Sequence, residues 1–136
     1  MSGDTVTGKA LQFTNDNKYA YAYSGTIGVT NVEKTMLKFN TNSEYLIAEF
    51  NMACNSGAGD DFDFIIKIDG VNVLESQITT PAQPSARFIN PIKLILPSYS
   101  EIEVTLENVT QESTLNWTVT LAAEVGMPQR VGNLDD

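Results

Sequence analysis

The sequence predicts an all-β protein made of about eight to ten antiparallel strands. Apolar and polar residues alternate with a period of two through several segments, most clearly over residues 44–54 and 115–125. Glycine, proline, asparagine and aspartate cluster between these segments, where they favour turns. No segment combines a sustained helical period with capping residues at its ends. Short strands separated by turn signals are typical of an antiparallel sandwich or barrel.

Four strands are expected in the first half of the chain, at residues 10–13, 19–29, 35–40 and 44–54. In the second strand, tyrosines alternate with Ala20 and Ala22, so the two residue types occupy opposite faces, and Gly25 favours a kink. In the fourth strand the apolar side is the expected core face, which consists of Leu46, Ala48, Phe50, Met52 and Cys54.

The second half supplies the remaining strands, at residues 62–69, 71–78, 91–97, 102–108 and 115–125, with a separate short segment at 87–90. Asp69 and Gly70 form the strongest hairpin signal, because glycine tolerates a positive φ. Residues 79–86 contain two prolines and cannot form a central strand. Pro91 and Pro97 are expected to bracket the strand between them. Trp117 alternates with apolar residues and is assigned to the core.

Length and charge predict a single domain that avoids polyanions. The chain has 136 residues and a net charge of −9, from 17 acidic and 8 basic residues. This length suffices for one core without metal or disulfides. An acidic surface repels phosphate backbones and anionic lipids, so we expect no nucleic-acid and no membrane partner. The first residues lack the apolar region of a secretory signal, which predicts synthesis in a cytoplasm.

The residues that most enzymes use are missing, so we expect no catalytic activity. The chain contains no histidine, which excludes Ser-His-Asp and Cys-His catalysis and histidine-based metal sites. Cys54 is the single cysteine and is expected to behave as a small buried hydrophobe. No glycine-rich phosphate-binding motif is present. We expect no cofactor; the alternative is a calcium site at Asp60, Asp61 and Asp63, which cluster beside a glycine-containing loop.

Four tyrosines are the candidate ligand or interface residues: Tyr19, Tyr21, Tyr23 and Tyr99. Aromatic faces stack on sugar rings, so the stripe at 19–23 suggests sugar binding. The alternative is that the stripe packs between the sheets or against a neighbouring subunit.

The compact region is predicted to span residues 10–126, between an N-terminal arm at 1–9 and a C-terminal arm at 127–136. Both arms are polar and lack periodicity. In the C-terminal arm, Pro128, Arg130 and Val131 are the candidate partner-binding residues, since they combine an extended segment with a charge and a small apolar anchor.

The stretch PIKLILPSYSEIEVTLENVTQESTLNWTVTLAAEVG, at residues 91–126, resembles the closing strands of small viral jelly-roll proteins of tailed phages. The hairpin DFDFIIKIDGVNVLESQ is similar to such domains as well. The resemblance implies a single jelly roll of about eight strands in two sheets. It also implies a homo-oligomer, with a trimer favoured, that assembles with capsid proteins.

The function expected from these observations is a non-enzymatic structural protein of a virion, of the capsid decoration (cement), minor capsid or head-fibre type. It is expected to reside in the virion after synthesis in the host cytoplasm. The alternative is a receptor- or carbohydrate-binding head domain of a viral fibre. The same fold serves both roles, so the sequence leaves both open.

Overall fold

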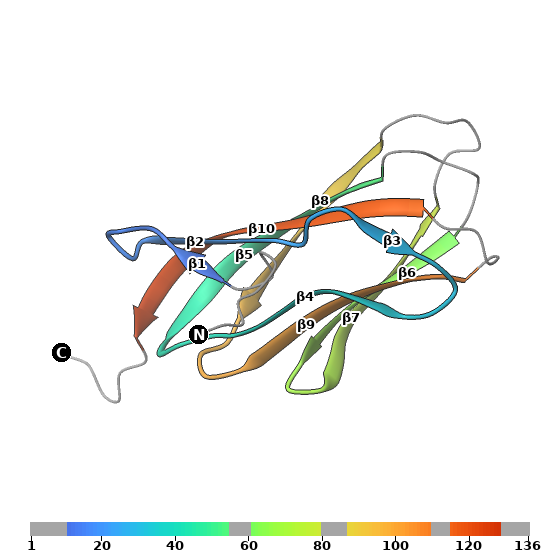
Figure 1. The fold of residues 1–136 in the computed structure, drawn as a ribbon. Coiled ribbons are helices and arrows are strands. Elements are labelled where there is room, and N and C mark those ends of the chain that lie inside the picture. The colour runs from blue at the N-terminus through green and yellow to red at the C-terminus, as the bar shows by residue number, and fades with distance from the viewer. Residues whose placement is uncertain (1–10, 55–60, 80–86, 110–114, 129–136) are drawn as a thin grey trace.

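Two antiparallel sheets pack face to face in the computed structural model, which describes residues 11–54, 61–79, 87–109 and 115–128 (Figure 1). The six-stranded sheet contains β1 (Gln12–Phe13), β2 (Tyr19–Tyr23), β10 (Leu115–Pro128), β5 (Glu44–Cys54) and β8 (Arg87–Leu96), in that order, with β3 (Ile27–Val29) also paired to β10. The four-stranded sheet has the order β4 (Lys34–Asn40), β9 (Glu101–Asn108), β6 (Asp61–Ile68) and β7 (Val71–Thr79).

The chain alternates between the two sheets from β4 onward, and only the β6–β7 hairpin stays within one of them. The order β2-β10-β5-β8 facing β4-β9-β6-β7 is consistent with a jelly roll, in which eight strands form two four-stranded sheets. The strands β1 and β3 bring the described total to ten, which exceeds the eight that the resemblance implied. The predicted all-β sandwich is therefore confirmed.

The core lies between the sheets and consists of the apolar sides of the alternating strands. The predicted core face of β5 is fully inward, and Cys54 is buried as expected. Trp117 is fully buried in β10, and its ring meets Phe62 of β6 edge-on, with ring centroids 5.0 Å apart. This contact joins the two sheets, and aromatic pairs prefer such edge-to-face geometry.

Local turn chemistry explains where several strands end. Asp69 and Gly70 both have positive φ, at 52° and 83°, and connect β6 to β7 as predicted. Gly25 has φ 73° and separates β2 from β3, so the segment predicted as one strand at 19–29 is divided at the expected kink.

Two predicted boundaries were wrong. Pro91 does not begin a strand, because residues 87–96 form the single strand β8. β8 lies at the edge of its sheet, where a missing N–H is tolerated, and the pairing with β5 shifts register between Phe50 and Met52. The last strand also continues through Pro128, two residues into the predicted C-terminal arm. The described residues contain no helix that could cross a membrane.

Candidate functional site: a tyrosine groove and a hydrogen-bonded turn end

The outer face of the six-stranded sheet carries the tyrosine stripe. Strand register aligns its outward side chains in rows that cross the sheet. One row contains Gln12, Tyr21, Ala122, Glu49 and Lys93, and the next contains Tyr19, Glu124, Ile47 and Ile95. The tyrosines of β2 point outward because Ala20 and Ala22 occupy the core side. The predicted alternative of packing between the sheets is therefore wrong.

A groove of about 380 Å³ lies across these two rows. Tyr19 and Tyr21 line it on one side, and Glu49 and Lys93 line it on the other. Ala122 stands between Tyr21 and Glu49 in the row, and its methyl group leaves the space that a larger side chain would fill. Tyr23 is on the same face but does not line the groove. The structure thus brings two of the four candidate tyrosines into one concave site.

The polar side chains of the groove are available to a ligand. The side chains of Glu49, Lys93 and Glu124 make no hydrogen bond or ion pair with any other residue that the structure describes. Glu49 and Lys93 are register partners on neighbouring strands, yet no ion pair joins them. Two carboxylates and one ammonium group therefore border the tyrosine rings with unused hydrogen-bonding capacity.

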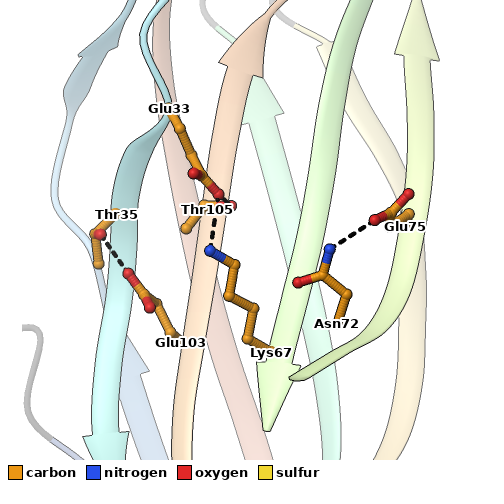
Figure 2. A network of polar contacts seen from close by, with 7 residues as sticks. All are labelled: Glu33, Thr35, Lys67, Asn72, Glu75, Glu103 and Thr105. Atoms are coloured by element: carbon orange, nitrogen blue, oxygen red, sulfur yellow. Dashed lines mark hydrogen bonds and ion pairs between the residues drawn. The ribbon is translucent and has the colours of Figure 1, made fainter. Parts of the chain in front are cut away.

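On the outer face of the four-stranded sheet, by contrast, several polar side chains bond one another (Figure 2). The Glu33 carboxylate accepts a hydrogen bond of 2.8 Å from the Thr105 hydroxyl and pairs with the Lys67 ammonium at 3.1 Å. Thr35 donates to Glu103 at 2.6 Å, as Figure 2 also shows. The Thr105 hydroxyl, and after it the Lys67 ammonium, lower the pKa of Glu33. These five side chains are therefore engaged with one another, unlike the charged side chains that border the groove.

One end of the sandwich holds three turns, at residues 41–43, 69–70 and 97–100 (Figure 1). We call this region the turn end. Thr41 connects the first turn to the third: its hydroxyl donates to the Pro97 carbonyl at 2.7 Å and accepts from the Ser100 N–H at 2.8 Å. The Asp69 N–H donates to the Glu101 carbonyl, and the Asp69 side chain accepts from the Glu101 N–H, each at 2.8 Å. The three turns are thus held as one unit.

Tyr99 is the exposed aromatic residue of the turn end. Its φ is 53°, in the left-handed region. The other described non-glycine residues with positive φ are Asn17 and Asp69, and asparagine and aspartate tolerate this backbone conformation. Its N–H donates to the Asn42 carbonyl at 2.9 Å, so a hydrogen bond fixes this backbone. The residue is 76% exposed. A bulky residue in this region costs roughly 1–3 kcal/mol, and such strain often marks a binding site.

The remaining predicted site residues do not converge on either surface. Asp61 and Asp63 lie on the outward side of β6, and Asp60 lies outside the described residues. Within the described residues, no three acidic, histidine or cysteine side chains gather in a way that could hold a metal ion.

The candidate residues of the C-terminal arm are only partly described. Pro128 ends β10 opposite Glu44, while Arg130 and Val131 lie outside the described residues.

No protein-family model matches the sequence, and no curated protein matches it. Among solved structures, the fold is similar to that of the VP2 subviral particle of infectious bursal disease virus, with a TM-score of 0.58 and 12% identity. The structure of the Gx strain of the same virus gives a TM-score of 0.54 and 11% identity. Each match covers 80% of this chain and 32% of the other, so the chain spans about a third of the length of those proteins.

These neighbours are viral capsid proteins. At such low identity the likeness shows a shared fold, and it agrees with the predicted viral capsid-like sandwich. The tailed-phage type stays a prediction.

Proposed function

We propose that this chain is a non-enzymatic structural protein of a virion, which binds its own copies and the neighbouring subunits of a capsid. The observation that carries this proposal is the sandwich itself, whose fold is shared with viral capsid proteins over 80% of the chain. The decoration, cement or minor capsid type is the specific role proposed. Such a protein stabilises a shell because it binds the assembled form and not the dissociated subunits.

The turn end is the surface through which we propose that it docks. Tyrosine is enriched among the residues that dominate binding energy at protein interfaces. The bonds of Thr41 and Asp69 fix the three turns before any partner arrives, which reduces the entropy lost on binding. Val71 begins β7 directly after the 69–70 turn and is also exposed, so it supplies apolar area at the same end.

The solution mass measured by multi-angle light scattering tests this proposal. The wild type is expected to form a discrete oligomer, with a trimer favoured. Tyr99→Asn is expected to shift the protein to monomer, since it removes the aromatic ring, and asparagine tolerates the left-handed backbone and so preserves folding. Val32→Ser is the matched control, because Val32 is 66% exposed but lies in the β3–β4 connection.

Two results would contradict the proposal. One is a wild type that remains monomeric at every concentration. The other is a Tyr99→Asn variant that assembles as the wild type does. Circular dichroism of each variant establishes that it is folded before its mass is compared.

A further inference from the structure

The groove across the tyrosine face has the size and the chemistry of a small-ligand site. Its volume of about 380 Å³ falls within the range of roughly 300–1,000 Å³ that is usual for such sites. It lies on the outer face of the six-stranded sheet, whereas the proposed docking surface lies at the turn end. Ligand binding at this face would be a function additional to the structural role and independent of it.

The aromatic lining indicates what kind of surface the ligand presents. Tyr19 and Tyr21 alternate along β2 and are each nearly half exposed, so part of each ring faces solvent. Among the described residues, the only ring pair is Phe62 with Trp117, so neither tyrosine ring stacks on another aromatic. An apolar ring face with a polar hydroxyl at its edge suits a flat ligand that is apolar on one face and polar at its rim.

The polar lining indicates what the rim of the ligand carries. The carboxylates of Glu49 and Glu124 accept hydrogen bonds, and the Lys93 ammonium donates them. Sugar hydroxyls both donate and accept, so they match this mixed set, and charge-assisted hydrogen bonds are the stronger kind. The three groups sum to one negative charge, and the whole chain carries −9, so an anionic sugar is repelled.

We propose that the groove lined by Tyr19, Tyr21, Glu49 and Lys93 binds a neutral oligosaccharide. The tyrosine rings stack on the sugar rings, the side chains of Glu49 and Lys93 bind hydroxyl groups on the opposite side, and Ala122 leaves space for the ring between them. No covalent step is involved.

A panel of neutral oligosaccharides, built from glucose, galactose and N-acetylglucosamine, tests the proposal, with sialyllactose as the anionic comparison. Affinities are measured by isothermal titration calorimetry with the full chain.

Tyr21→Thr is expected to weaken binding by at least about fivefold, since stacking is lost while threonine preserves strand propensity. Glu49→Gln is expected to weaken binding by a similar factor, since the charged acceptor is lost. Ala122→Leu is expected to block the groove.

Tyr23→Thr is the matched control, because Tyr23 is on the same strand and face, and its exposed fraction is 49%, against 48% for Tyr21. It is expected to bind as the wild type does. The proposal is overturned if no panel member binds at millimolar concentration, if sialyllactose binds best, or if Tyr23→Thr weakens binding as much as Tyr21→Thr.

Light scattering on the Ala122→Leu variant separates the sugar site from a protein interface. Unchanged assembly supports the proposal. Loss of assembly would show that the groove holds a second copy of the chain, and would overturn it. Failure of Tyr99→Asn to alter the mass would leave the sugar measurements unaffected, so the two proposals fail independently.

Discussion

Single hydroxyl groups extend the hydrogen-bond ladder where strands end. Ser24 follows the last residue of β2, and its Oγ accepts from the Val119 N–H at 2.9 Å and donates to the Gly25 carbonyl at 2.6 Å. The Ser24 N–H also donates to the Val119 carbonyl at 3.0 Å. Both residues are buried, so water cannot replace these bonds. Thr41 performs the corresponding task at the turn end.

Ser24→Ala is predicted to destabilise the protein by about 1–3 kcal/mol, because it leaves the buried Val119 N–H without an acceptor. Urea unfolding followed by the fluorescence of Trp117, the single tryptophan, measures this change. Thr26→Ala is the control, since Thr26 also carries a hydroxyl and lies in the same connection but is exposed. Its expected effect is within about 0.5 kcal/mol. Equal effects of the two substitutions would contradict the assigned role of Ser24.

Glu33 is predicted to make the free energy of unfolding depend on pH in the acid range. The hydrogen bond from Thr105, and next the Lys67 ammonium, lower the pKa of Glu33 from its ordinary value of 4.5. The unfolded chain therefore binds this proton more readily than the folded one. The contribution is fully present above pH 4.5 and is lost as pH falls through the lowered pKa. Because the carboxylate is partly exposed, the effect is modest.

Acid unfolding of Glu33→Gln measures this contribution. The variant is expected to lose less stability than the wild type as the pH falls below 4.5. Glu124→Gln is the control, since its carboxylate bonds no other described residue. A Glu33→Gln variant with the wild-type acid slope would contradict the prediction.

At the scale of elements, β10 organises the six-stranded sheet, since it pairs with β2, β3 and β5 along its 14 residues. Its pairing with β5 shifts between Val125 and Pro128, where one extra residue lies on β10. Gly126 stands within this irregularity, and a Cβ atom there would overlap the ring of Tyr45. The close approach of Tyr45 to the backbone therefore requires glycine at this position.

Gly126→Ala is predicted to destabilise the protein by about 1–3 kcal/mol through this overlap. In a Tyr45→Ser background, where the ring is absent, the same substitution is expected to cost much less. Urea unfolding of the two single variants and the double variant completes the cycle. Additive effects would show that the ring is not the cause.

The features predicted correctly from sequence are those set by local chemistry. The Asp69-Gly70 turn needs only two residues with positive φ, and the face assignment of β5 needs only a period of two. The predicted strand start at Pro91 was wrong, because a proline within a strand is tolerated only where that strand lies at a sheet edge. That β8 is an edge strand is a property of the whole sheet. The bonds of Thr41 to Pro97 and Ser100 join residues more than fifty positions apart, and no local pattern signals them.

At the scale of the whole molecule, the two outer faces of the sandwich have different chemistry. Several polar side chains of the four-stranded sheet bond one another, whereas the six-stranded sheet exposes tyrosines beside unbonded charges. Tyr19 and Tyr21 can be predicted as site residues from the sequence, whereas Glu49, Lys93 and Ala122 cannot. These residues become neighbours only through the register of β2, β10, β5 and β8, which are not consecutive in the chain. The asymmetry is therefore a product of topology.

The net charge of −9 is predicted to make self-association depend on salt. Copies that dock through the turn end approach one another against like charge, and the contact itself is aromatic and apolar. Salt shortens the screening length from about 30 Å at 0.01 M to about 8 Å at 0.15 M, so it weakens the repulsion far more than the contact. The oligomer fraction measured by light scattering is expected to rise over this range. A fraction that falls with salt would indicate an interface held by opposite charges, and would move the docking surface away from Tyr99.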